Sequence, residues 1–153
     1  LADELNMLQL YLELESLRFR QSFHYTIQTD PSIDAESLLV PPLLLQPFIE
    51  NALWHGLMLK EGEKQLQITV SKEGEQLLCV IEDNGIGRKK AAEIKAQKIG
   101  AAHFESKGLK LSQQRIELLK AEGGNGFVKI EDLYENELAS GTRVAVYLPL
   151  IYT

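Results

Sequence analysis

Cysteine is scarce in this chain, and long apolar runs are missing. Cys79 is the only cysteine among 153 residues, so no disulfide can form within the chain, which fits a reducing compartment. No run approaches the ~20 apolar residues that a membrane-spanning helix needs. The first residues show no signal-peptide pattern. The sequence itself therefore predicts neither a disulfide-stabilised scaffold nor a membrane span.

Basic residues are also in deficit. The chain has 16 Lys and Arg against 22 Asp and Glu, for a net charge of −6, which argues against a nucleic-acid partner. It is 44% hydrophobic and 25% charged, as expected of a single globular domain with a real core. Because it starts with Leu1 inside a helical pattern, we expect it to be a piece of a longer protein.

Apolar residues recur at helical or strand spacing along most of the chain. The pattern predicts helices over 3–21, 41–58, 89–97 and 108–122, and strands over 23–30, 66–70, 77–81, 127–133 and 142–150. Short turns between neighbouring strands imply antiparallel pairs, and helices with one apolar face would cover one side of the sheet. We therefore predict an α+β two-layer sandwich whose mixed, mostly antiparallel sheet is covered on one face by helices.

Polar residues interrupt the apolar helix "QPFIENALWHG". Asn51 and His55 are four residues apart, so they share a helix face, whereas Glu50 lies about 100° round from Asn51. Gly56 is a plausible end of the helix. A polar side turned to water would explain the pattern as well as a site does.

The segment "EDNGIG" follows a strand that is apolar on both faces. Asp83 shares strand parity with Cys79 and Ile81, so its carboxylate should point into the layer that they line, where it needs a hydrogen-bond donor. Gly85 and Gly87 would let the backbone turn sharply or approach a ligand closely. An ordinary turn after a strand is the alternative.

Two further segments are weaker signals. "SKGLKLS" opens the last helix, whose free N–H groups could bind phosphate at Lys107, Gly108 and Leu109. "SGT" enters the final strand, where Gly141 permits close backbone approach and Thr142 offers a hydroxyl. Each also fits a plain helix start or turn. Between "DNGIG" and that last helix, residues 88–107 form a basic, weakly periodic connection of the kind that serves as a lid.

The order and spacing of these segments resemble the N, G1, G2 and G3 boxes of the histidine-kinase, gyrase, Hsp90 and MutL ATPase superfamily. "VPPLLLQPFIENALWHG" and "YLELESLRFRQSFHYTI" are similar to the LytS/YehU type of bacterial sensor histidine kinase. The resemblance implies the Bergerat-type ATPase fold, with residues 1–21 as a linker helix from a dimerisation and phosphoacceptor region and 22–153 as the catalytic ATP-binding domain.

The resemblance also implies a site for ATP and Mg²⁺. Asn51 would hold the metal, and Glu50 and His55 would be the catalytic residues, with Glu50 as a base or polarising carboxylate and His55 near the phosphates. Asp83 would accept from the adenine amino group and Thr142 would lie close to it. Gly85 and Gly87 would wrap the purine. Lys107, Gly108 and Leu109 would meet the phosphates.

Two departures from the family pattern limit these expectations. Ser106 and Leu111 replace the glycine and asparagine of the G2 box, which indicates either a damaged site or a branch in which Ser112 supplies the small polar group. The phosphoacceptor string P-H-F-L-F-N is not in the sequence, and His24 and His103 fall in a strand and in the lid.

The resemblance therefore implies the catalytic domain of a two-component sensor histidine kinase. It would be the cytoplasmic domain of an inner or plasma membrane protein. It would move the γ-phosphoryl group of ATP to a histidine on its own homodimeric dimerisation domain. A response regulator would then take the phosphoryl group from that histidine. A nucleotide-dependent interaction module without kinase activity is the alternative. The short chain argues against a third class, an ATPase clamp of the gyrase or MutL kind.

Overall fold

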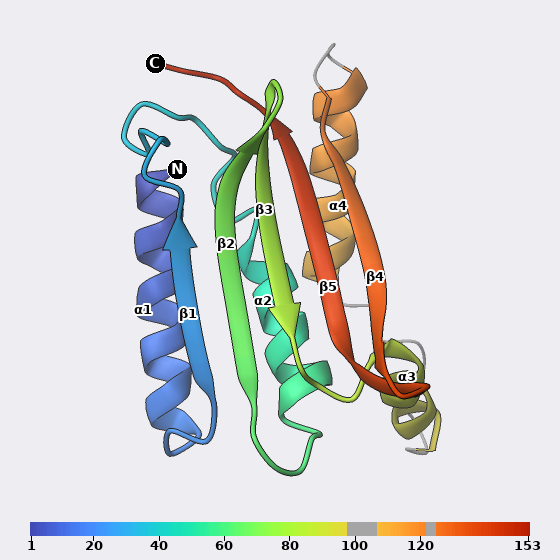
Figure 1. Cartoon of the computed structure of the whole chain (residues 1–153). Helices are drawn as coiled ribbons and strands as arrows, with labels where there is room; N and C mark the ends of the chain where they lie inside the picture. The colour runs from blue at the N-terminus through green and yellow to red at the C-terminus, as the bar shows by residue number, and fades with distance from the viewer. Residues whose placement is uncertain (98–106, 122–124) are drawn as a thin grey trace.

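The computed structural model describes residues 1–97, 107–121 and 125–153. Figure 1 shows the elements in chain order. They are α1 (Ala2–Arg18), β1 (His24–Thr29), α2 (Gln46–Asn51), a π-helix η1 (Ala52–Leu57), β2 (Gln65–Glu73), β3 (Gln76–Asp83), α3 (Arg88–Gln97), α4 (Lys107–Ala121), β4 (Phe127–Glu135) and β5 (Leu138–Pro149). Every predicted helix and strand has a counterpart among them.

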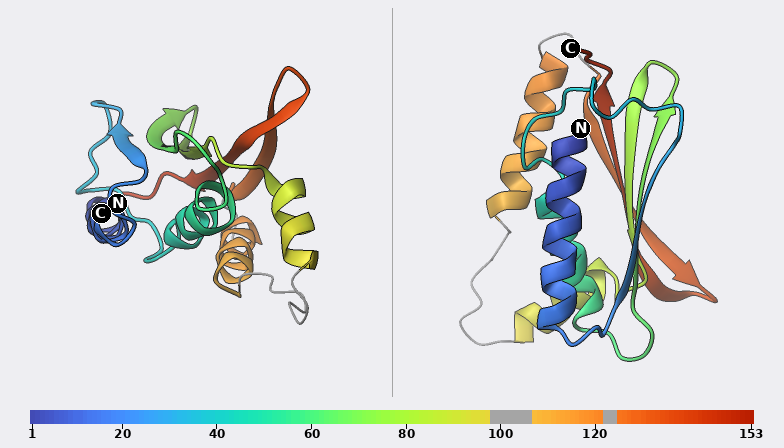
Figure 2. Two further views of the ribbon diagram at one scale, coloured as in Figure 1. Left: turned by 90° about the horizontal axis from the view of Figure 1, so that it is seen from below. Right: turned by 90° about the vertical axis from the view of Figure 1, so that its left-hand side faces the viewer.

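The strands form one five-stranded sheet in the order β1-β2-β3-β5-β4. β1 runs parallel to β2, and the other neighbours are antiparallel. Helices α1, α2 and α4 lie against one face of this sheet (Figure 2). The structure therefore confirms the α+β two-layer sandwich with a mixed, mostly antiparallel sheet. The strand order could not be read from local sequence.

The core lies between the sheet and the helices. Alternate residues of β2 and β3 are buried on the helix side, as period-two patterning requires, among them Ile68, Cys79 and Ile81. Leu8 and Leu12 of α1 are buried in the same cluster as the strand residues. The first helix thus packs on the same core as the sheet.

A buried carboxylate connects α1 to the segment before α2. Glu4 accepts hydrogen bonds from the backbone N–H groups of Leu43 and Leu45, at 2.8 and 2.9 Å. These two bonds satisfy the buried charge. They also hold the irregular loop before α2 in place, including Leu43 at a positive φ of 54°. The start of α2 is therefore held by the N-terminal helix.

The helix predicted over 41–58 is shorter and less regular than expected. It begins at Gln46, so Pro47 lies in its first turn, where proline is tolerated, and does not kink it. The π-helix η1 continues it to Leu57, so Gly56 does not end the helix. Gly56 instead lies inside the π-turn, where it packs against the Asp83 side chain.

The last hairpin is longer than predicted. The segment "YENELASG", expected to be a loop, is mostly strand, and β4 and β5 turn at Asn136 and Glu137, with φ of 50° and 66°. Positive φ at both positions matches the twist of a tight hairpin. The sequence hid this turn because glycine occupies neither position.

The predicted lid is described only in part. Its first half is α3, which confirms the short helix expected over 89–97. Ser106 and His103 lie outside the described residues, as does the rest of 98–106. Among the helices of the described ranges, none is long and apolar enough to cross a membrane.

Candidate functional site

A cavity of about 740 Å³ opens between the sheet, the α2–η1 helix, α3 and the start of α4. The residues that line it come from all of these elements: Phe48, Asn51, His55, Gly56, Asp83, Gly87, Arg88, Ala91, Ala92, Lys95, Leu109, Lys110, Gln113, Ile130, Thr142 and Val144. Its volume is in the range of small-molecule sites. The structure thus brings together Asn51, His55, Asp83 and Thr142, which the sequence singled out separately.

Asp83 lies on the sheet side of the cavity, with only 5% of its surface exposed. It ends β3 on the inward face, as its strand parity predicted. Its Oδ1 accepts from the Gly85 N–H at 2.9 Å, and the backbone of Thr142 is a second donor. Burial raises the pKa of Asp83 to about 6 despite these bonds. The fold therefore holds a desolvated carboxylate whose charged form a further hydrogen-bond donor would stabilise.

Glycines pack directly around this carboxylate. A Cβ on Gly56 would come within 2.8 Å of Asp83 Oδ1, and one on Gly85 within 2.4 Å of the Gly56 carbonyl carbon. Gly141, at φ +142°, would place a Cβ 1.9 Å from the Asp83 carbonyl oxygen. Side chains at these positions would push the helix, the loop and β5 apart. The glycines let three segments converge on one acidic group.

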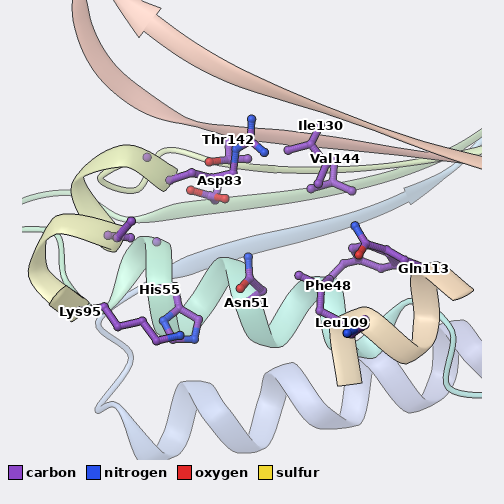
Figure 3. Close-up of a pocket in the computed structure, with 16 residues that line it drawn as sticks. Phe48, Asn51, His55, Asp83, Lys95, Leu109, Gln113, Ile130, Thr142 and Val144 are labelled. Carbon is purple, nitrogen blue, oxygen red and sulfur yellow. The ribbon is translucent and has the colours of Figure 1, made fainter. Parts of the chain in front are cut away.

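Asn51 and His55 project from the α2–η1 helix into the cavity, whereas Glu50 does not line it (Figure 3). Glu50 is half-buried and accepts a 2.9 Å hydrogen bond from Gln46 Nε2. It lies near Tyr11 of α1, whose pKa is raised to about 12 mainly by burial and to a smaller extent by the charges of Glu15 and Glu50. π-turns occur often at functional sites, and here the π-turn carries His55 and Gly56.

His55 and Lys95 lie at one end of the cavity, with the Lys95 side chain pointing toward His55 (Figure 3). Burial lowers the pKa of His55, and the positive charge of Lys95 lowers it further. The imidazole is therefore held in its neutral form near pH 7. This end of the site therefore offers a lysine side chain beside a neutral imidazole.

The remaining predicted residues belong to α4 and to the turn after β3. Lys107, Gly108 and Leu109 form the first turn of α4, and Leu109 lines the cavity. Gly85 is in the turn after Asp83, and Gly87 lines the wall at φ +84°. Leu111 is 57% exposed, whereas Ser112 is buried outside the cavity lining.

Sequence reasoning missed several lining residues. Gln113 follows Leu109 by four positions on α4, so helical spacing could have found it. Ile130 and Val144 face each other in the β4–β5 register and supply apolar floor. Lys95 falls within the basic connection 88–107 in the sequence, and its place at the cavity depends on how α3 packs.

The side chains of the described ranges do not themselves form a metal cage. No three His, Cys, Asp or Glu residues there group together in a way that could hold an ion. Mg²⁺ is usually bound through one or two protein ligands, substrate phosphates and water. The half-buried amide of Asn51, which points into the cavity, fits that kind of site.

The chain is similar to several bacterial proteins. YwpD of Bacillus subtilis, an uncharacterized protein, is 32% identical over 114 residues, covering 74% of this chain and 39% of that protein. Sensor histidine kinase YpdA of Escherichia coli is 28% identical over 153 residues, covering 95% of this chain and 24% of YpdA. Sensor protein LytS of Bacillus cereus is 28% identical over 152 residues, covering 97% and 24%.

The chain belongs to the ATP-binding domains of LytS/YpdA/BtsS-type sensor histidine kinases. Its kind of domain is the catalytic and ATP-binding domain of a histidine kinase. The chain spans 24% to 39% of the length of the curated relatives named above. The catalytic domain of histidine kinase ThkA has the same fold, with a TM-score of 0.64 at 14% identity over 100% of this chain and 95% of that one. No protein-family model matches the chain.

Proposed function

We propose that this domain binds ATP with Mg²⁺ in the cavity and transfers the γ-phosphoryl group to a histidine on an upstream dimerisation segment. A response regulator would then take the phosphoryl group from that histidine. The observation that carries the proposal is the buried Asp83 carboxylate facing a cavity into which Asn51 and His55 also project. Family membership supports ATP as the nucleotide.

The adenine is proposed to bind at Asp83. The exocyclic amino group of adenine is a donor, and the desolvated carboxylate has acceptor capacity beyond its two backbone bonds. Thr142 lies directly opposite Asp83 in the β3–β5 register and can add a hydroxyl to the same end. Gly85 and Gly87 would let the turn after Asp83 wrap the purine, although their own Cβ positions face Gly56 and Ala139.

The phosphates are proposed to extend along the α2–η1 helix. Asn51 would hold the Mg²⁺, which neutralises charge on the phosphate oxygens when bound. His55 would donate a hydrogen bond from its neutral ring. The first turn of α4, with Lys107, Gly108 and Leu109, would present backbone N–H groups, as helix N-termini do. Positioning and charge neutralisation supply most of the rate in phosphoryl transfer.

Glu50 is proposed to act outside the nucleotide cavity. It is one residue before Asn51, on the side of the helix near α1, with Gln46 holding one of its oxygens. A phosphoacceptor imidazole approaching from that side would meet the carboxylate, which could polarise it for attack. The proposal places residues 1–21 as the linker to the dimerisation segment, in a homodimeric membrane-anchored protein whose kinase domain faces the cytoplasm.

Titration calorimetry of the domain with Mg·ADP, Mg·ATP and Mg·GTP tests the binding step. We expect both adenine nucleotides to bind and GTP to bind far more weakly, because guanine has a carbonyl where adenine has its amino group. Equal binding of GTP, or no binding of either adenine nucleotide, would contradict the assignment of Asp83.

The full-length protein tests the transfer step. Incubation with ATP radiolabelled at the γ-phosphate should give an acid-labile, base-stable phosphoprotein, and the Glu50→Gln variant should lose labelling while the domain keeps nucleotide affinity. Nucleotide binding without any labelling would instead support the interaction module, for which the exposure of Leu111 at the altered G2 box is the structural argument.

A further inference from the structure

Helix α3 forms one wall of the cavity although the core hardly holds it. Arg88, Ala91, Ala92 and Lys95 all line the cavity from this helix. None of the α3 side chains, from Arg88 to Gln97, is buried. A helix with so little apolar contact needs some other interaction to stay in place, because ordering its backbone costs about 1–2 kcal/mol per residue.

One polar contact anchors the first residue of α3. The Arg88 guanidinium donates two hydrogen bonds to Asp132 on β4, from Nε to Oδ1 at 2.7 Å and from Nη2 to Oδ2 at 2.8 Å. This bidentate geometry is the strongest form of an arginine–carboxylate pair and fixes direction as well as distance. It joins residues 44 positions apart in the sequence.

Asp132 is well placed for this contact by the sheet register. It pairs with Thr142 on β5, and Thr142 pairs with Asp83 on β3. The three residues therefore form one row across adjacent strands. Arg88 thus ties α3 to the same row that carries the proposed adenine-binding carboxylate.

The residue before Arg88 is suited to act as a pivot. Gly87 has φ +84°, a conformation that side chains disfavour, and a Cβ there would lie 3.2 Å from the Ala139 Cβ on β5. The backbone is held at Ile86, which is buried and donates to the Gly56 carbonyl, and it then passes through Gly87 to the Arg88–Asp132 pair. The pair therefore fixes the first residue of α3 directly after the glycine.

We propose that Arg88 and Asp132 form a latch that positions α3 as a wall of the nucleotide cavity. Both are positioning residues, and the inference rests on the proposed nucleotide site. The pair raises the pKa of Arg88 and lowers that of Asp132, so both stay charged across the neutral range. Both side chains are partly exposed, at 49% and 37%, so the latch should weaken with salt.

The test uses Arg88→Gln, Asp132→Asn and the charge exchange Arg88→Asp/Asp132→Arg. Exposed ion pairs are worth little, so we expect each single variant to raise the Kd for Mg·ADP by only about two- to fivefold. Amide hydrogen exchange in α3 of the free protein should accelerate by a similar factor. The exchanged pair should restore both readouts, which a merely local structural effect would not do.

Glu131→Gln is the matched control. Glu131 is the neighbour of Asp132 on β4 and forms its own 2.8 Å ion pair with Lys129, but it does not line the cavity. We expect this variant to bind Mg·ADP like the wild type and to leave α3 exchange unchanged.

The outcomes separate the latch from the proposed function. Unchanged exchange in α3 overturns the latch, even where Kd rises, because Arg88 would then act on the ligand directly. Faster exchange with unchanged Kd also overturns it. If the wild-type protein binds no adenine nucleotide, the proposed function and the latch's role at the nucleotide site fail together, and the exchange data still show whether the pair holds α3.

Discussion

At the scale of single residues, Asp83 shows a conflict between binding and stability. Burial raises its pKa to about 6, against 3.8 for a free aspartate. The folded state therefore disfavours the charged form, which is the better acceptor for an amino group. Stability from this group is fully present below pH 3.8 and is lost as the pH rises through about 6. Because the pKa of Asp83 is higher in the folded than in the unfolded state, its ionisation lowers the free energy of unfolding by about 3 kcal/mol at pH 7.

We expect Asp83→Asn to abolish or strongly weaken adenine-nucleotide binding while the domain stays folded. An amide cannot ionise, so the variant should be more stable than the wild type at pH 7, by up to about 3 kcal/mol. Calorimetry with Mg·ADP measures binding, and denaturant unfolding at pH 7 and pH 4 measures stability.

The stability gain should shrink toward zero at pH 4, where the wild-type carboxyl is already mostly protonated. A gain of the same size at both pH values would mean that packing, not charge, separates the two side chains. Unchanged nucleotide affinity at pH 7 would show that Asp83 does not bind the purine.

Asn51→Ala should act on the metal and leave the base untouched. We expect the Mg²⁺ dependence of ATP binding to fall more than adenosine binding does, because adenosine brings no phosphates for the ion to bridge. Titrations of ATP with and without Mg²⁺, and of adenosine, measure the three affinities. If the metal dependence keeps its wild-type size, Asn51 does not hold the metal.

The direction in which a side chain points was predictable where the repeat of a strand or helix determines it. Strand alternation placed Asp83 on the inward face, and helical spacing put Asn51 and His55 together. The direction of Glu50 was not predictable, since it depends on which side of the helix α1 covers. The Arg88–Asp132 pair was equally hidden, because no local pattern joins strand β4 to α3.

At the scale of elements, the presence of each helix and strand was predicted more accurately than its first and last residues. The α2–η1 helix starts late because Glu4, far away on α1, holds the preceding loop. It passes through Gly56 because that glycine packs on Asp83. Both causes are tertiary contacts, which a window of neighbouring residues cannot contain.

Helix α1 offers a test of how far it belongs to the domain core. Leu8 is fully buried, whereas Leu14 of the same helix is 67% exposed. We expect Leu8→Ala to lower the free energy of unfolding by about 2–5 kcal/mol through the cavity that it leaves. Leu14→Ala should change it by no more than about 0.5 kcal/mol.

Denaturant unfolding of the two variants measures the difference, and their equal helix propensity change makes them a matched pair. Small, similar effects from both would mean that α1 only rests on the domain. They would also favour a boundary near residue 21 as a true division between folding units.

At the scale of the whole molecule, the layer architecture was predictable and the strand order was not. Periodicity determines how many strands and helices there are and which faces they bury. The order β1-β2-β3-β5-β4 and the parallel β1–β2 pair depend on long connections, such as the one from β1 through α2 to β2. The cavity exists only once those connections bring α3, α4 and the sheet together.

We expect the described helices and strands on the common core to unfold as one unit. Amides in the middle of α1, around Leu8 and Leu12, should open with the same free energy as amides of β3 around Cys79, because their side chains share one cluster. Native-state hydrogen exchange over a range of low denaturant concentrations measures both. A markedly lower opening free energy for α1 would show that it separates first, as a linker would.

Trp54 is the chain's only tryptophan, and it lies where α1 meets the site helix. Its indole is edge-on to Phe19 at 5.1 Å, with the Arg18 guanidinium 5.1 Å from the ring centre, and His55 is the next residue. Indole emission responds to nearby charge and to water. The intensity and wavelength of Trp54 fluorescence should therefore change when a nucleotide binds on the cavity side of the helix. They should also change if α1 separates from the other side, so both events can be followed without an added dye.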